Sequence, residues 1–163
     1  MREQEAKKAK QLQEQKKKEA ERKLREEEEQ RKKMQGGLEY ILDSLKNSKS
    51  ETHVGIRGIE LSHVRLRLLA KSLELNTSCE SIDLSRKSLT DEDGVALAQM
   101  LEKNNHLRVL TLEGNKLGLK AARAFAEALQ VNTTLKTLNL ESNNITFNGS
   151  EQSGVMDISN ALR

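Results

Sequence analysis

LRVLTLEGNKL (107–117) recurs 28 residues earlier as CESIDLSRKSL (79–89) and 28 residues later as LKTLNLESNNI (135–145), without a gap. A degenerate copy one repeat further back, ETHVGIRGIEL (51–61), keeps most of the same apolar positions. Apolar residues alternate with other residues in each copy, as Leu110 and Leu112 do, and a period of two is typical of a strand with one buried face. An internal repeat of this length predicts a solenoid of stacked units.

The segment that follows each strand pattern changes to helical spacing. Its apolar or small residues form sets that are again 28 residues apart, namely Leu66/Leu69/Leu73, Gly94/Leu97/Leu101 and Ala122/Phe125/Leu129. The same spacing carried back one more repeat reaches Leu38, Ile41 and Leu45, so we expect an N-terminal capping helix within 38–50. Asparagine recurs where the helices should end, and we expect it to stop each one in a left-handed conformation. These residues are Asn76, Asn104 and Asn132.

The pattern is completed by Asn115 and Asn143, and over 38–163 it resembles leucine-rich repeats of the ribonuclease-inhibitor type. The resemblance implies an α/β solenoid with a parallel sheet on the concave face and helices on the convex face. About four repeats are expected over 51–163. Ile59 and Lys87 stand where the family places Asn, so the asparagine ladder should be incomplete toward the N-terminus.

The last repeat departs from the pattern. Matching Val155, Ile158 and Leu162 to the helix positions requires an insertion, which the polar stretch FNGSEQSG (147–154) supplies, and no capping element follows. The sequence VNTTLKTLNLESNNIT (131–146), at the start of this repeat, is similar to the C-terminal repeat domain of the tropomodulin and leiomodin family. That resemblance implies an actin-facing surface on the third and fourth repeats.

The N-terminal segment 1–35 has a different composition. Residues 1–34 hold 13 Lys/Arg and 9 Glu, with few apolar side chains. Seven Glu residues precede a Lys or Arg by four positions, as in Glu14/Lys18, Glu19/Lys23 and Glu21/Arg25, and such pairs stabilise a solvated helix. Leu12, Leu24 and Met34 are too sparse for a coiled-coil seam. We therefore favour a single charged helix over a coiled-coil-like extension, with a partly disordered tail as the remaining alternative.

Composition weighs against several functional classes. The excess positive charge is confined to the N-terminal segment and interleaved with Glu, and aromatic residues make up 2% of the chain, so we expect no nucleic-acid partner. No apolar run approaches a membrane span, and we expect no membrane partner. The single cysteine, Cys79, excludes an internal disulfide and fits a reducing compartment, and we interpret it as a buried structural thiol.

Nothing in the sequence predicts catalysis. His53, His63 and His106 are scattered without metal-ligand spacing, no glycine-rich phosphate loop is present, and no nucleophile, base and oxyanion donor form a set. We therefore expect no enzyme activity, no metal and no cofactor.

The binding residues are instead expected on the outward side of the strands, where the repeat register forms columns. Two columns are Gly55/Asp83/Thr111/Asn139 and Arg57/Ser85/Glu113/Glu141. The candidate partner-binding residues are Arg57, Asp83, Ser85, Thr111, Glu113, Asn139 and Glu141. Acidic side chains gather toward the C-terminal repeats, and our hypothesis is that they meet a basic patch on a protein partner.

The function that these features favour is a cytoplasmic scaffold of the cytoskeleton or the cilium, which binds actin, tubulin or an axonemal protein through its concave face. A regulatory binder of the GTPase-activator or inhibitor type is one alternative. A protein that binds microtubules through the charged helix is another. The sequence leaves the oligomeric state open.

Overall fold

The computed structural model describes residues 14–26, 37–56, 58–146 and 153–161. The chain divides into two compact units, Met1–Tyr40 and Ile41–Arg163. After α2 (Leu38–Lys46), strands and helices alternate in the order β1 (His53–Gly55), α3 (His63–Leu73), β2 (Ser81–Asp83), α4 (Asp91–Lys103), β3 (Val109–Thr111), α5 (Leu119–Val131), β4 (Thr137–Asn139) and α6 (Ser153–Ala161).

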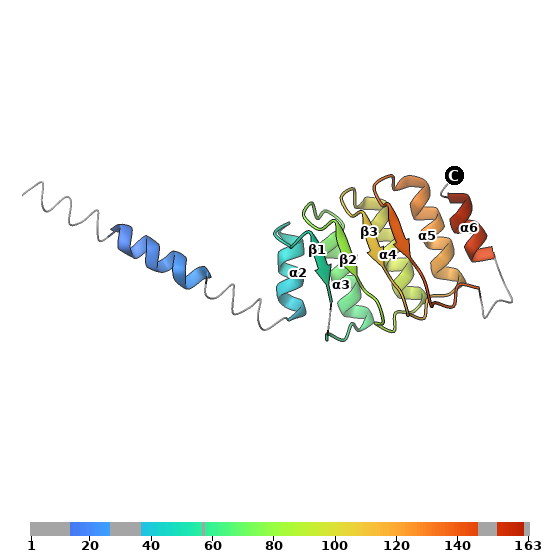
Figure 1. Cartoon of the computed structure of the whole chain (residues 1–163), viewed down its shortest axis with the longest axis horizontal. Helices are drawn as coiled ribbons and strands as arrows, with labels where there is room; N and C mark the ends of the chain where they lie inside the picture. The colour runs from blue at the N-terminus through green and yellow to red at the C-terminus, as the bar shows by residue number, and fades with distance from the viewer. Residues whose placement is uncertain (1–13, 27–36, 57, 147–152, 162–163) are drawn as a thin grey trace, which may run out of the picture. The chain divides into compact units, whose positions relative to one another are not determined.

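The four strands form one parallel sheet in the order β1-β2-β3-β4 (Figure 1). Ser81 pairs with His53 on one side and with Val109 on the other, and Val109 pairs with Thr137. The register therefore advances by the 28 residues of the sequence repeat, which confirms the predicted leucine-rich-repeat solenoid. Parallel strands need crossover connections, and here each crossover is a helix.

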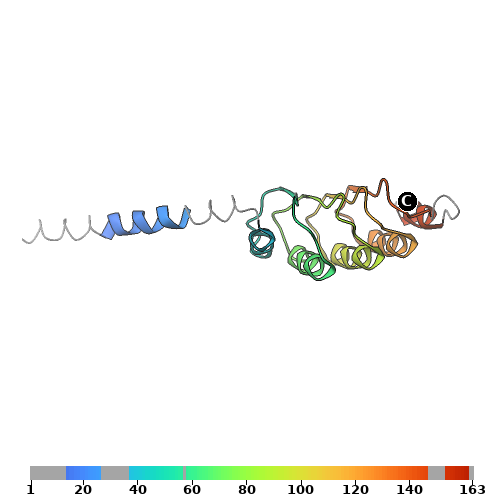
Figure 2. The same ribbon diagram turned by 90° about the horizontal axis from the view of Figure 1, so that it is seen from below.

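Strands and helices form two layers, with the core between them. In Figure 2 the strands run along one side, and helices α3, α4 and α5 follow the outside of a shallow arc on the other. Ile82 and Leu84 of the second repeat, like Leu110 and Leu112 of the third, are fully buried. The alternation in the sequence thus points one face of every strand toward the helices, and the opposite face is left for solvent or a partner.

Asparagine ends the helices by a different mechanism from the predicted one. Asn104 and Asn132 have extended backbone conformations, with φ of −77° and −82°, so the expected left-handed conformation is wrong. The buried Asn104 side chain instead accepts from the N–H groups of His106 and Leu107, at 2.9 and 2.7 Å. Its amide donates to the Leu73 carbonyl of the preceding helix at 2.6 Å. Each such asparagine therefore satisfies a helix end in the repeat before its own.

An asparagine also joins α2, which precedes the first repeat, to the rest of the solenoid. Asn76 donates to the carbonyl of Leu45, near the end of α2, at 2.6 Å. The Leu45 side chain is fully buried. Since Asn104 makes the equivalent bond to α3, α2 stands where the helix of a preceding repeat would stand, as the spacing predicted.

A second asparagine ladder runs along the bends after the strands. The Asn115 side chain accepts from the N–H groups of Lys87 and Leu89, at 2.8 and 3.1 Å, and donates to the carbonyls of Leu84 and Leu112. Asn143 donates to Leu112 in turn, at 2.9 Å. The ladder stops at Lys87, whose ammonium group donates to the Ile59 carbonyl at 3.0 Å, so the predicted gap toward the N-terminus is present.

Residues 14–26 form a helix whose side chains are all exposed. Two of the predicted ion pairs are present, Glu14 with Lys18 at 3.0 Å and Glu19 with Lys23 at 3.6 Å. Arg22 and Glu26 form a further pair at 3.4 Å, with the charges in the reverse order. The predicted pairs before residue 14 and after residue 26 lie outside the described residues, and the preference for a single helix stays a prediction.

The last repeat is less completely covered than the second and third repeats. Leu138 and Leu140 are half-buried, whereas their counterparts one repeat earlier are fully buried. The helix after the strand, α6, is present, and its Ile158 is half-buried. The predicted insertion lies largely in 147–152, outside the described residues.

Candidate partner-binding face

The outward side of the sheet brings most of the predicted binding residues into columns. Asp83 lies opposite Thr111, and Thr111 opposite Asn139, on adjacent strands. The backbone ladder continues beyond the strands, since the Arg86 N–H donates to the Glu113 carbonyl at 2.8 Å and the Gly114 N–H to the Glu141 carbonyl at 2.9 Å. That continuation keeps Ser85, Glu113 and Glu141 side by side in a second column. Arg57 lies outside the described residues.

Local hydrogen bonds hold part of this face in place. The Asp83 carboxylate accepts from both the N–H and the hydroxyl of Ser85, at 2.9 and 2.6 Å. Asn139 accepts from the N–H of Glu141 at 2.9 Å. A side chain that accepts from the backbone two residues on is a common turn device. These residues therefore shape the ends of their strands. Asp83 and Glu141 are exposed, whereas Ser85 and Asn139 are half-buried.

Arg86 changes the electrostatics of the predicted acidic strip. Its guanidinium Nη2 lies 3.2 Å from Oε1 of Glu113 in the next repeat. The Glu141 side chain is exposed, and no cation among the described residues lies within ion-pair distance of it. The negative charge is thus partly neutralised at Glu113 and strongest at Glu141. Sequence reasoning missed Arg86, although its place one residue after the Ser85 column was the available signal.

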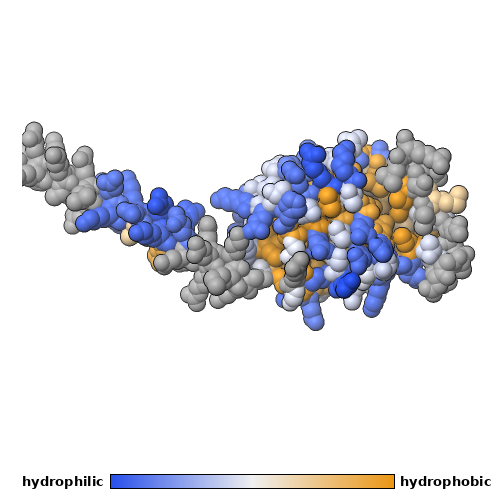
Figure 3. All heavy atoms as spheres, in the orientation of Figure 1, coloured by the Kyte–Doolittle hydropathy of each residue, from blue (hydrophilic) through white to orange (hydrophobic). Residues whose placement is uncertain are grey.

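The face also has apolar parts. Over the strands, Figure 3 shows hydrophobic and hydrophilic residues next to one another. Val109, which lies in the outward column of His53 and Ser81, is a half-buried apolar residue of this face. Mixed surfaces of this kind are typical of protein interfaces, whose composition is close to that of the remaining surface.

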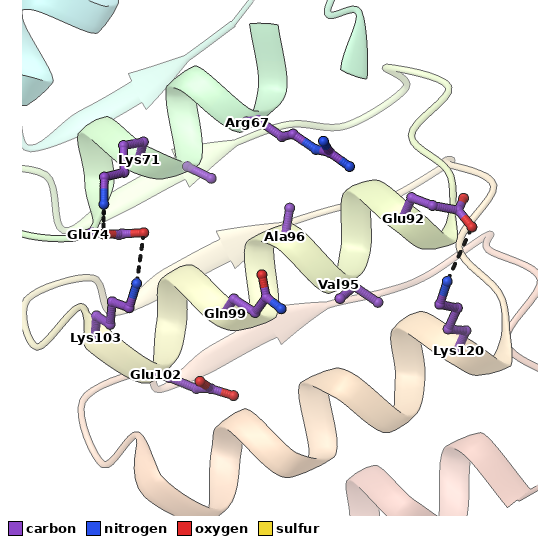
Figure 4. A pocket seen from close by; sticks show the side chains of 11 residues that line it. Arg67, Lys71, Glu74, Glu92, Val95, Ala96, Gln99, Glu102, Lys103 and Lys120 are labelled. Atoms are coloured by element: carbon purple, nitrogen blue, oxygen red, sulfur yellow. Dashed lines mark hydrogen bonds and ion pairs between the residues drawn. The ribbon is translucent and has the colours of Figure 1, made fainter. Parts of the chain in front are cut away.

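The helical side carries a groove of about 660 Å³ between α3 and α4, which is lined mainly by charged side chains (Figure 4). Glu74 accepts from Lys71 at 2.7 Å and from Lys103 of the next helix at 3.2 Å. Glu92 and Lys120 pair across the next two helices at 3.3 Å. Figure 4 shows these pairs bridging neighbouring helices at the two ends of the groove.

These contacts alter the ionisation of both carboxylates. The hydrogen bond from Lys71, joined by that from Lys103, lowers the pKa of Glu74 below its ordinary value, against the opposing effect of burial. The pKa of Glu92 is also lowered, chiefly by its own backbone N–H and by Lys120. Both groups are therefore held as carboxylates, whereas a general acid needs a raised pKa. The ion pairs that line the groove, Glu74 with Lys103 and Glu92 with Lys120, join adjacent repeats.

The described His, Cys, Asp and Glu residues do not form a metal centre. Among the residues described, no group of three or more His, Cys, Asp or Glu side chains is arranged to hold a metal ion. Cys79 is fully buried, as predicted, and burial raises the pKa of its thiol to about 11. No helix in the described part of the chain has the length and apolar character needed to cross a bilayer.

Comparison with known families places the repeats in a known class. A family model described as Leucine Rich repeat matches residues 103–126 and 131–149. A search of the curated proteins finds no match.

Solved structures include two similar folds. The structure of actin-binding site 2 of leiomodin-1 matches with a TM-score of 0.58 and 22% identity, over 74% of this chain and 87% of that one. The C-terminal domain of tropomodulin from Caenorhabditis elegans matches with a TM-score of 0.52 and 18% identity, over 77% of this chain and 90% of that one. The chain thus has a leucine-rich-repeat fold, which it shares with actin-binding site 2 of leiomodin-1 and with the C-terminal domain of tropomodulin.

Proposed function

We propose that this protein is a non-enzymatic interaction module whose outward strand face binds a protein partner. The observation that carries the proposal is that residues on the two faces of each strand differ in burial. Inward residues such as Leu110 are fully buried against the helices, whereas Asp83 and Glu141 project from the opposite face and are exposed. A stacked sheet of this kind offers a broad and rigid surface, which suits a protein partner better than a small molecule.

Actin is the partner that we propose. One support is the similarity in fold to a domain of leiomodin-1 that is an actin-binding site. A second is the charge of the last two repeats, because the exposed carboxylate of Glu141 and the half-exposed one of Glu113 would complement a basic patch. The cytoplasm and the cytoskeleton are accordingly the proposed location, and tubulin or an axonemal protein is the alternative partner.

Actin binding is tested by sedimentation of the full chain with purified actin filaments and by a parallel titration of actin monomers. We expect saturable binding to one of the two forms that persists when salt is raised from about 50 to about 200 mM. Exposed charge contacts weaken with screening, whereas an interface with apolar parts is less sensitive to it. The same assay with microtubules is the comparison. Binding to microtubules alone, abolished by the added salt, would support the charged helix as the binding element and would reject this proposal.

A further inference from the structure

The interruption of the asparagine ladder at Lys87 leaves a bend with donors and no acceptor. In the following repeats, an asparagine oxygen takes the N–H groups of the preceding bend. Asn115 accepts from Lys87 and Leu89 at 2.8 and 3.1 Å, and Asn143 accepts from Leu117 at 3.1 Å. A lysine side chain offers three donors and no acceptor, so it cannot do the same for the bend before it.

The N–H groups concerned are those of Ile59 and Leu61, which lie 28 residues before Lys87 and Leu89. No acceptor among the described residues takes either of them. Leu61 is nevertheless buried and Ile59 half-buried. A buried backbone donor costs free energy unless it finds a partner. This bend therefore differs from the equivalent bends of the later repeats, because no asparagine oxygen accepts from its N–H groups.

The same bend lines a groove of about 840 Å³ that also contains Arg65, Arg86 and Lys87. Lys87 is held by the Ile59 carbonyl at 3.0 Å, and Arg65 by the Glu60 carbonyl at 3.3 Å. Both of these cations are positioned by neutral oxygens, so their positive charge is not cancelled by the contact.

Carboxylates do little to neutralise this groove. Arg86 forms an ion pair with Glu113. Among the residues that line the groove, Glu60 is the acidic one, and its side chain is exposed. The first turn of α3, which begins beside the groove, contains no acidic residue. Besides the ion-paired Arg86, two cations and one carboxylate line the groove, and the local field favours an anion.

We propose that this groove binds the carboxylate of an Asp or Glu side chain in an acidic segment of a protein partner. A carboxylate is planar and has the dimensions of an asparagine amide, so its oxygens can take the N–H groups of Ile59 and Leu61 as Asn115 takes those of the next bend. Lys87 and Arg65 supply the opposite charge, and charge-assisted hydrogen bonds of this kind are stronger than neutral ones. The site differs from the outward strand face and does not depend on actin.

The test is an NMR titration of the full chain with an end-blocked hexaglutamate peptide, and with hexaglutamine as the neutral probe. We expect the amide signals of Ile59 and Leu61 to shift downfield with hexaglutamate alone. The amides of Leu89 and Leu117 should stay in place, because asparagine oxygens already accept from them. Equal shifts with hexaglutamine, or none at Ile59 and Leu61, would overturn the proposal.

The variant Lys87→Asn separates binding from folding. The new asparagine can accept from Ile59 and Leu61 and complete the ladder, so the thermal midpoint should stay constant or rise while hexaglutamate affinity falls at least about tenfold. Arg65→Gln, which leaves the ladder untouched, should weaken binding as well. Lys116→Asn is the matched control, since Lys116 is exposed in the next bend and lies outside the groove.

Inorganic phosphate is the competing probe. Retained affinity in Lys87→Asn, or shifts with phosphate but not with hexaglutamate, would rule out carboxylate recognition at this groove. Loss of affinity in the Lys116→Asn control to the same degree would mean that overall charge, and not this site, attracts the peptide.

Discussion

At the scale of single residues, the asparagines at the helix ends are the side chains that join one repeat to the next. Asn104 is 3% exposed, and its side chain forms hydrogen bonds with two loop N–H groups and with the Leu73 carbonyl. No buried polar side-chain atom in the described residues lacks a partner. An unpaired buried polar group costs about 1–3 kcal/mol.

Asn104→Ala should therefore lower the free energy of unfolding by about 2 kcal/mol, because the loop N–H groups and a helix carbonyl lose their partner together. The neighbouring Asn105 is exposed, and Asn105→Ala is expected to stay within about 0.5 kcal/mol of the wild type. Urea denaturation followed by circular dichroism gives both values. Equal effects of the two substitutions would show that the Asn104 bonds contribute no net stability.

Cys79 is predicted to be chemically inert in the folded protein. Its thiol is fully buried and has a pKa raised to about 11, against an ordinary value of 9.0. That difference lowers the thiolate fraction near pH 8 by about 100-fold, and the thiolate is the reactive form. Alkylation by iodoacetamide should be slow in native buffer and rapid in urea. Fast alkylation of the native protein would mean that the second repeat opens readily.

The sequence predicted where these residues would recur, but not always what they would do. The spacing of Asn104 and Asn132 placed them correctly at helix ends. Their hydrogen bonds reach into the preceding repeat, however, and a linear pattern does not show which carbonyl will face a given amide. Lys87 was recognisable as a break in the ladder. Its effect on the N–H groups of Ile59 and Leu61 required the structure, since it depends on which acceptors come within reach.

At the scale of elements, the approach of α4 and α5 depends on a glycine. A Cβ atom built on Gly94 would lie 2.5 Å from the Cβ of Ala121, which is far inside van der Waals contact. The predicted helix pattern already included Gly94 at a core position. The pattern did not show why a small residue is needed there. The reason is that the backbone of α5 at Ala121 lies close to Gly94.

Gly94→Ala should destabilise the protein by about 1–3 kcal/mol through overpacking, although alanine is the better helix former by about 1 kcal/mol. Adding Ala121→Gly removes the opposing Cβ and should restore part of the loss. The double variant is thus expected to be more stable than Gly94→Ala alone, by thermal and urea denaturation. Strictly additive losses would indicate that the two helices adjust without strain.

Glu74 gives α3 and α4 a pH-dependent contact. Its pKa is lowered in the folded state by Lys71 and Lys103, so the contact stabilises the protein above the ordinary pKa of 4.5 and is lost as the pH falls through the lower, folded-state value. Glu74→Gln should cost about 0.5 kcal/mol near pH 7. The difference from the wild type should vanish in strongly acidic buffer. A difference that is independent of pH would assign the effect to packing.

At the scale of the whole molecule, the fold was predictable because one 28-residue period specifies both layers of the solenoid. The sheet register reproduces that period, and alternating residues such as Ile82 and Leu84 are buried as expected. The proposed binding face was predictable only as columns of positions. Its charge distribution depends on a contact between repeats, that of Arg86 with Glu113, which no single repeat contains.

The central claim is that the outward strand face of the last repeats binds the partner, and charge reversal tests it most directly. The affinity of the full chain for actin would be measured by titration for the wild type, for Glu113→Lys/Glu141→Lys and for Glu102→Lys/Glu127→Lys. The second pair makes the same charge change at exposed positions on the helices. We predict a loss of at least about tenfold for the first pair, which is about 1.4 kcal/mol, and less than about twofold for the second. Equal affinities of the two variants would contradict binding through the strand face.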